Sequence, residues 1–377
     1  MKKIGIMTFH ASYNCGSILQ GMALQNVLKT KFNQESEIID FSNEGQQKVY
    51  SVMYKKLTLK NIVKNMLCVP GIKMIKKHYD EYEKYIRSHF RLSEKSYSKE
   101  SELHGIEKNY SMLIAGSDQI WNTKCDDADP AYFLSFAKNT KKIAYAPSLG
   151  ATNILEIENS EEYKKYLDDF DYLSVREHNG QLWLEELTGR HVELVLDPTL
   201  LLTKEEWEQY IEKDIGIKGN FIFYYAFSYD KDNNEQIQKI AEENNLKVIV
   251  IDAKQWYIKR LYKYKNFVLC DYTGPNAFLY LMKNSKYVIT TSLHGAAFSS
   301  IFNKQFAYIN RKKHNPADDR AKSMLTLLNL LDRFKHIEDV NIELLNAPID
   351  YKTAEADKKI LKEKSLKYLE GAINNKK

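Results

Sequence analysis

The chain lacks the features that mark disulfide-rich, zinc-binding and membrane-spanning proteins. Its only cysteines in 377 residues are Cys15, Cys68, Cys125 and Cys270, and no two of them form a CxxC pair. This spacing argues against a zinc site and a disulfide framework, and it fits a reducing compartment. The apolar run after the first lysines is too short for a signal peptide, and no run approaches the ~20 residues that a membrane span needs. The sequence therefore predicts a cytoplasmic protein.

A dinucleotide-binding fingerprint and a calcium loop are also missing. Residues 14–17 open the first expected helix, but no GxGxxG pattern accompanies them, so a nicotinamide or flavin cofactor is not expected. The acidic residues Asp126, Asp127 and Asp129 do not follow the EF-hand pattern. We interpret them as turn residues and expect no metal.

The composition that remains is that of an ordinary globular protein with unevenly spread charge. Hydrophobic residues make up 44% of the chain and charged residues 28%, and the net charge is +5. Residues 51–95 hold eleven Lys/Arg against four Asp/Glu, a local net charge of +7. Two interpretations of this segment are open: a solvated helical hairpin, or a cationic amphipathic surface that contacts an anionic membrane peripherally. No nucleic-acid-binding module is present, so we expect no nucleic acid partner.

Apolar runs of strand length alternate with helical periodicity in two series along the chain. Such alternation predicts an α/β protein with two Rossmann-like, doubly wound domains that face each other across a cleft. We expect an N-terminal domain over residues 1–165, a C-terminal domain over 166–350 and a C-terminal helix within 351–377. The expected strands lie at 4–9, 37–41, 112–115, 142–147, 172–175, 192–196, 221–227, 248–251, 287–289 and 306–309.

Polar clusters recur at the carboxyl ends of these strands, which is where open α/β sheets bind their ligands. One cluster places an imidazole at the start of a helix. Imidazole transfers protons near neutral pH, and a helix N-terminus attracts anions. For any one cluster, a structural cap or turn is the alternative. The candidate site residues are Asn14, Gly16, Ser117, Asp118, Gln119, Arg176, Asp197, Ser292, His294 and Gly295.

Several of these candidates have two competing interpretations. Asp118 either contacts sugar hydroxyls or acts as a base, or else it caps a helix, and Trp121 either stacks on a sugar ring or packs in the core. Arg176 either grips an anion with its guanidinium or pairs with a neighbouring helix. The basic run Arg311-Lys312-Lys313-His314 either meets phosphate or belongs to a solvated loop. An arginine in the first turn of a helix opposes the helix dipole, so Arg320 is expected to have a specific partner.

In combination, the motifs resemble the polysaccharide pyruvyl transferase family. The resemblance implies a GT-B-like fold with the acceptor side in the N-terminal domain, the donor side in the C-terminal domain, and a C-terminal helix. It also implies transfer of the pyruvyl group of phosphoenolpyruvate to hydroxyls of a sugar, with formation of a pyruvate ketal and release of phosphate. The sugar would belong to a surface glycan (capsule or exopolysaccharide) or its lipid-linked precursor. The matching stretches are YNCGSILQGMALQNVL (13–28), LIAGSDQIWN (113–122), KIAYAPSLG (142–150), LSVREHNG (173–180), LDPTLLL (196–202) and TGPNAFLYLMKNSKYVITTSLHGAAFSSIF (273–302).

The resemblance assigns the family's histidine to His294 and its arginine to Arg176. Some members carry arginine two residues before the histidine, where this chain has Ser292, so contacts to the donor phosphate fall to Arg311, Lys312 or Arg320. The residues allow His294 to act as general acid.

A carboxylate, Asp118 or Asp197, is the expected base, and no cofactor besides the donor substrate is expected. Two rival functions stay open: a glycosyltransferase of the same architecture that uses a nucleotide-sugar, and a non-enzymatic glycan-binding relative.

Overall fold

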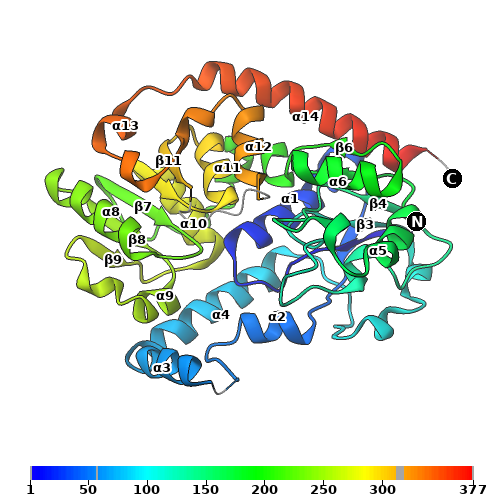
Figure 1. Cartoon of the computed structure of the whole chain (residues 1–377), viewed down its shortest axis with the longest axis horizontal. Coiled ribbons are helices and arrows are strands. Elements are labelled where there is room, and N and C mark those ends of the chain that lie inside the picture. The colour runs from blue at the N-terminus through cyan, green and yellow to red at the C-terminus, as the bar shows by residue number, and fades with distance from the viewer. Residues whose placement is uncertain (1, 57, 311–317, 376–377) are drawn as a thin grey trace.

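Two parallel β-sheets form the two halves of the molecule (Figure 1). The computed structural model describes residues 2–56, 58–310 and 318–375. In the first sheet the strand order is β2-β1-β3-β4, and all pairs are parallel. Parallel strands require crossover connections, and those that follow β1 and β2 contain α-helices. The strands are β1 (Lys3–Met7), β2 (Ser36–Ile38), β3 (Tyr110–Ala115) and β4 (Lys141–Ala144).

The second sheet has six parallel strands in the order β12-β11-β10-β7-β8-β9. Its central strand β10 is buried along its whole length, as the continuous apolar run in the sequence predicts for a strand covered on both faces. The strands are β7 (Phe221–Tyr225), β8 (Lys247–Val250), β9 (Phe267–Leu269), β10 (Tyr287–Thr290), β11 (Gln305–Ile309) and β12 (Phe334–Lys335).

Two short strands, β5 (Ser174–Val175) and β6 (Glu193–Leu194), pair with each other as a separate two-stranded sheet next to the first sheet. A parallel bridge joins Ile143 to Tyr172, and the amide of Ala144 donates to the carbonyl of Tyr172 at 2.9 Å. The expected division placed these strands in the second domain, beginning at residue 166. The bridge shows that the chain just before β5 lies beside β4, and the domain boundary at residue 166 stays a prediction.

Helices cover both sheets and connect their strands. The loop residue Gly189 ends α6 in the left-handed conformation (φ 66°), as the sequence predicts for a C-terminal stop. The helices are α1 (Cys15–Phe32), α2 (Glu44–Val49), α3 (Leu59–Cys68), α4 (Ile72–His89), α5 (Ser160–Asp168), α6 (His178–Thr188), α7 (Lys204–Glu208), α8 (Lys231–Glu243), α9 (Ala253–Ile258), α10 (Gly274–Asn284), α11 (Leu293–Ile301), α12 (Arg320–Leu327), α13 (Ile342–Asn346) and α14 (Tyr351–Asn374).

Helix α1 lies in the centre of the molecule (Figure 1) and is buried on nearly all sides. The spacing of its apolar residues predicts an amphipathic helix with one buried face. Its other face is buried too, because α1 packs against α10 of the second half and against Pro198–Leu201. Asn14 caps its start by accepting a hydrogen bond from the amide of Gly16 at 2.9 Å. The packing of α1 at the centre of the molecule therefore fixes the position of the turn formed by residues 14–16.

The basic segment forms the helices α3 and α4, which reach from the first half to the second. Glu81 of α4 accepts a hydrogen bond from the amide of Thr273 at 2.6 Å, and Lys77 donates to the carbonyl of Asp271 at 2.7 Å. Both helices contact α9, and α4 also packs on α10. Helix α4 is therefore an internal support and not part of a solvated hairpin, and the membrane interpretation of the segment stays a prediction.

The C-terminal helix α14 returns across the molecule from the second half to the first (Figure 1). Near its start, Tyr351 donates to the carbonyl of Lys304. Near its end, Ser365 accepts from the amide of Leu196 at 2.9 Å, and Tyr368 donates to the carbonyl of Ala144 at 2.8 Å. The helix thereby ties both halves together. Across the described ranges, no helix combines the length and apolarity that a bilayer crossing requires.

Candidate functional site

Five of the polar clusters predicted from the sequence meet between the two sheets. The chain segments that follow β3, β5 and β6 bring Asp118, Arg176 and Asp197 together from the first sheet. The segment that follows β10 brings His294 from the second sheet, and the start of α1 brings Gly16 against it. This is the arrangement expected where parallel strands end at a common edge.

Arg176 and Asp197 form the buried base of the site. The guanidinium Nη1 lies 2.6 Å from Oδ2 of Asp197 and 3.2 Å from Oγ of Ser117, while Nη2 lies 3.5 Å from Oδ1 of Asp118. Ser117 donates to the same oxygen of Asp197 at 3.0 Å. Arg176 therefore pairs with Asp197 and Asp118, and its Nε lies 3.9 Å from Oε2 of Glu177, the residue before α6; the anion-gripping role of its guanidinium stays a prediction.

His294 is only 4% exposed, and its ring is held from two sides. Its Nε2 lies 3.5 Å from Oδ2 of Asp197. Its Nδ1 lies against Gly16, where a methyl group would come within 2.1 Å of the nitrogen. Gly16 is therefore needed for close approach between α1 and α11, and Asp197 fixes the orientation of the imidazole.

The charge state of Asp197 follows from its partners. Burial by itself would raise the pKa of this carboxyl, but the charge and hydrogen bond of His294 and the charge of Arg176 outweigh it and hold the pKa well below its usual range. A carboxylate that stays ionised so firmly is a poor proton acceptor. Of the two carboxylates expected as base, Asp197 is thus better suited to positioning His294.

Asp118 sits in a strained backbone conformation at the edge of the site. Its φ is 75°, in the left-handed region that non-glycine residues seldom adopt. Its carboxylate accepts hydrogen bonds from Oγ of Ser17 and from the amide of Gln119. Asp118 forms a parallel bridge with Pro147 and a bend and a turn follow it, with no helix, so the helix-capping interpretation is wrong. The strain holds the carboxylate at the wall of a cavity.

Trp121 belongs to the core. Its side chain is fully buried, its Nε1 donates to the carbonyl of Tyr132 at 3.1 Å, and its ring stacks on Phe133. The core interpretation of this residue is confirmed, and the interpretation as a sugar-stacking platform is wrong.

The remaining predicted residues make local contacts around the site. Gln119 accepts a hydrogen bond from Asn122 at 3.1 Å. Ser292 stands at the N-cap position of α11 without a capping hydrogen bond from its side chain, and its amide donates to Oγ1 of Thr290 at 3.0 Å. A methyl group on Gly295 would lie 2.1 Å from Oγ1 of Thr290, so this glycine lets α11 start close to β10. Arg311 and the rest of the basic run 311–314 lie outside the described residues.

Arg320 has the specific partner that its position against the helix dipole predicts. Its Nε and Nη2 each lie 2.6 Å from an oxygen of Asp318. Burial would lower the pKa of this guanidinium, but the hydrogen bonds and charge of Asp318 raise it. Arg320 lines the same cavity as His294 and Arg176.

That cavity has a volume of about 220 Å³. The N-termini of α1 and α11 converge beside it, since Gly16 of one touches His294 of the other. Helix N-termini and arginines both favour anions. The cavity is lined by Phe9, Asn14, Ser17, Val49, Tyr50, Asp118, Gln119, Cys125, Asp126, Asp127, Arg176, Phe227, Leu293, His294 and Arg320.

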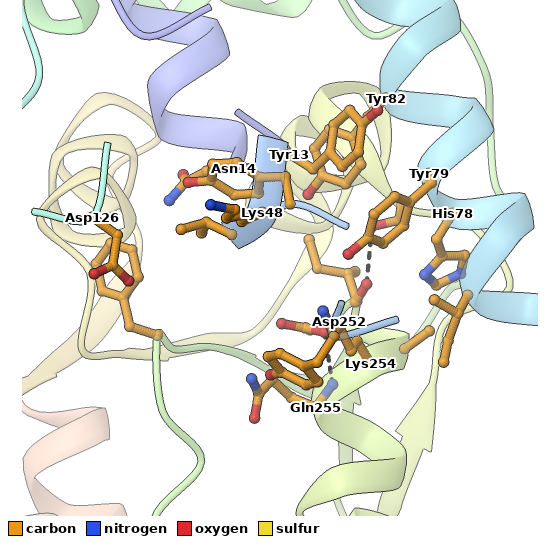
Figure 2. A pocket seen from close by; sticks show the side chains of 18 of the residues that line it. Tyr13, Asn14, Lys48, His78, Tyr79, Tyr82, Asp126, Asp252, Lys254 and Gln255 are labelled. Carbon is orange, nitrogen blue, oxygen red and sulfur yellow. Dashed lines mark hydrogen bonds between the residues drawn. The ribbon is translucent and has the colours of Figure 1, made fainter. Parts of the chain in front are cut away.

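A larger cavity of about 1250 Å³ adjoins it and shares Asn14, Tyr50 and Phe227 with it. Figure 2 shows Tyr79 beside Tyr13 and Tyr82, with Asp252 and Lys254 lower in the same view. Seven tyrosines line this cavity: Tyr13, Tyr50, Tyr54, Tyr79, Tyr82, Tyr225 and Tyr229. Tyrosine offers an apolar ring face and a hydroxyl, which suits a polar ligand with ring-shaped apolar faces.

Two groups of functional candidates escaped the sequence reasoning. Glu177 is fully buried, accepts a hydrogen bond from the amide of Leu149 at 2.7 Å, and burial raises its pKa to about 7 against the opposing charges of Arg176 and Arg320. The only feature of the sequence that pointed to Glu177 was its position directly after Arg176. The tyrosines of the larger cavity were signalled only by the high count of 26 tyrosines in the chain.

The donor set of the site is suited to anions more than to a metal. Among the residues that the structure describes, no group of three or more His, Cys, Asp or Glu side chains is arranged to hold a metal ion. Asp118 and Asp197 both face Arg176, which satisfies part of their charge.

The fold and the site together define a two-domain α/β protein of the GT-B type with a polar site between the domains. The chain belongs to the polysaccharide pyruvyl transferase family, whose model matches residues 14–313. Comparison with curated protein sequences gives no match.

Solved structures confirm the GT-B-like fold. The S. aureus MnaA–UDP structure is 12% identical with a TM-score of 0.55, and the match covers 99% of this chain and 97% of that one. A putative UDP-N-acetylglucosamine 2-epimerase from Listeria monocytogenes is 11% identical with a TM-score of 0.55, covering 100% and 98%. UDP-GlcNAc 2-epimerase from Methanocaldococcus jannaschii is 14% identical with a TM-score of 0.50, covering 100% and 94%. At such identities the likeness concerns the fold alone.

Proposed function

We propose that this protein transfers the pyruvyl group of phosphoenolpyruvate to hydroxyls of a sugar in a surface glycan or its lipid-linked precursor. The product is a pyruvate ketal, and phosphate leaves. Membership of the family supports the proposal. The observation that carries it is the imidazole of His294, fixed between Gly16 and Asp197 at the wall of a small cavity that also holds Arg176 and Arg320.

The small cavity suits the donor in size and charge. Its 220 Å³ lies below the ~300–1,000 Å³ of pockets for drug-sized ligands, so it is suited to a small molecule. Phosphoenolpyruvate carries a carboxylate and a phosphate, which need cations and N–H donors. Arg320 and the N-termini of α1 and α11 supply them. Ser292, at the position where some relatives have arginine, is outside this lining, so in our proposal the donor phosphate is held by Arg320 and the helix N-termini.

The chemistry requires a proton on the methylene carbon of the donor. In our scheme His294 gives that proton, a sugar hydroxyl attacks the adjacent carbon, and the C–O bond to phosphate breaks. A second hydroxyl then closes the ketal. Of the two hydroxyl protons released, one returns to His294 and the other leaves with phosphate, so the protons balance. Asp118 faces the same cavity and is the carboxylate placed to accept a hydroxyl proton.

The larger cavity suits the acceptor. It opens beside the donor pocket, and Asn14 belongs to both. The tyrosine rings of this cavity provide faces for sugar rings. The tyrosine hydroxyls and the side chains of Asp252 and Lys254 provide hydrogen bonds. A sugar that enters here would bring its hydroxyls toward His294 and Asp118.

The direct test measures phosphate release from phosphoenolpyruvate by the purified protein, with glycan precursors extracted from the source organism as acceptor. Mass spectrometry of the acceptor should show an added pyruvate ketal. His294→Ala should abolish both signals while the far-UV circular dichroism stays unchanged. Turnover of that variant near the wild-type level would exclude His294 as the acid.

A nucleotide-sugar-dependent transfer is the second candidate, because the S. aureus structure of the same fold was solved with UDP. It predicts that UDP-sugars raise the melting temperature and that phosphoenolpyruvate does not. The pyruvyl transfer proposal predicts the reverse. A protein that binds glycans without turning over either donor would indicate the non-enzymatic alternative.

A further inference from the structure

Helix α3 presents apolar side chains to solvent and polar ones to the protein. Leu59, Val63 and Met66 are 85%, 55% and 67% exposed, and Ile62 lies beside them at helical spacing on the same face. Val69, just past the helix, is exposed as well. An ordinary surface helix has the opposite orientation. The exposed apolar face of α3 is therefore an unpartnered surface.

The inward side of α3 explains why the helix stays in this orientation. Asn65 exchanges hydrogen bonds with both backbone groups of Tyr54, at 2.9 and 3.0 Å, and Asn61 donates to the carbonyl of Lys56 at 3.0 Å. Cys68 is buried in a small apolar cluster that includes Tyr257 of α9. These contacts fix the helix, so its apolar face is held outward rather than free to turn in.

Positive charge surrounds this face. Residues 51–79 contain seven lysines and no Asp or Glu. Lys60, Lys73 and Lys76 are exposed, and no carboxylate among the described residues forms an ion pair with them. An apolar stripe on a helix with lysines around it is the pattern of helices that lie in the interface of an anionic membrane.

We infer that α3 docks the protein on an anionic lipid bilayer, with its apolar face in the headgroup region and its lysines on the lipid phosphates. A second copy of the chain is a weaker occupant. A two-fold contact through α3 would bring the lysine clusters of both copies together, and like charges oppose association. One ten-residue helix also offers little area against the ~1,200–2,000 Å² of stable interfaces.

The docking face lies next to the larger cavity. Tyr54, Lys55, Lys56 and Asn61, which precede or belong to α3, line that cavity. In Figure 1, α3 lies at the lower edge of the molecule, and α14 lies at the opposite edge. An acceptor anchored in the bilayer would reach the cavity from this side. Docking itself stands without the proposed reaction, and only this role in presenting an acceptor rests on it.

Vesicle sedimentation of the full chain tests the inference without any activity assay. Wild type should bind vesicles containing phosphatidylglycerol, and binding should fall with added salt and be much weaker on phosphatidylcholine alone. The double variants Val63→Asp/Met66→Asp and Lys60→Glu/Lys73→Glu should each weaken binding by about tenfold or more. The matched control is Lys359→Glu/Ile360→Asp, an exposed Lys-Ile pair on α14, which should bind like wild type.

Several results would overturn the inference. The first is that the wild-type protein does not sediment with phosphatidylglycerol vesicles. The second is that both α3 variants bind as well as wild type. The third is that the α14 control loses as much binding as the α3 variants. A fourth is a dimer in light scattering that Val63→Asp/Met66→Asp converts to monomer, because a second copy would then cover the face. Melting temperatures near wild type show that the exposed substitutions leave the fold intact.

Discussion

Replacing Gly16 with alanine should disable the site while leaving the fold in place. The added methyl group would lie 2.1 Å from Nδ1 and 2.4 Å from Cγ of His294, so the ring must move. Moving it separates Nε2 from Asp197, now 3.5 Å away. A displacement of about 1 Å in a catalytic group can cost about 10²-fold in rate, and loss of a general acid about 10²–10⁴-fold. We therefore expect phosphate release to fall at least about 10²-fold.

The stability of the same variant separates this effect from unfolding. Alanine favours a helix over glycine by about 1 kcal/mol, whereas overpacking costs about 1–3 kcal/mol, so the net loss should not exceed about 2 kcal/mol. The matched control is Gly371→Ala in α14, where the methyl group meets no described atom within 4 Å. It should keep full activity and gain up to about 1 kcal/mol. Gly16→Ala with activity within about twofold of wild type would refute the reasoning.

Three further substitutions probe other residues of the two cavities and their support. Arg176→Lys keeps a positive charge but loses the forked guanidinium that contacts both Asp118 and Asp197, so turnover with phosphoenolpyruvate should fall about tenfold or more. Unchanged steady-state kinetics would show that the guanidinium is dispensable. Burial raises the pKa of Glu177 to about 7, so its contribution to stability is present below pH ~4.5 and is lost as pH rises through 7. A pKa shift corresponds to about 1.4 kcal/mol per pH unit, so the free energy of unfolding of Glu177→Gln should rise by up to about 3 kcal/mol relative to that of wild type between pH 4.5 and 8. Unfolding free energies of the two proteins that change in parallel with pH would contradict this. Tyr79→Ala should raise the KM for acceptor more than that for phosphoenolpyruvate, and an equal rise in both would argue against the larger cavity as the acceptor site.

The strands and the polar clusters at their ends could be predicted because they depend on local sequence. A continuous apolar run such as 287–289 needs cover on both faces, which gives a parallel sheet, and a parallel sheet gathers the residues after its strands. His294, Asp118 and Arg176 follow from that argument alone. The conflict between the charge of Arg320 and the helix dipole predicted that this arginine has a specific partner.

The rest depends on contacts between distant segments. The segment just before β5 joins the first sheet through a bridge from Tyr172 to Ile143 and through backbone hydrogen bonds to Lys142 and Ala144, which no local pattern signals. Trp121 was ambiguous because the same side chain suits a sugar and a core, and Tyr132 and Phe133 decide the matter. The role of Gly16 appears only when His294, nearly 280 residues later, is packed against it.

The transfer reaction itself is the most direct test of the central claim. Purified protein would be incubated with phosphoenolpyruvate and the extracted glycan precursors in heavy water, and the product analysed by mass spectrometry. We predict a pyruvate ketal whose methyl group carries one deuterium, one phosphate released per ketal, and neither product from His294→Ala. A ketal formed equally well by His294→Ala, or sugar transfer from a UDP-sugar in place of ketal formation, would contradict the account.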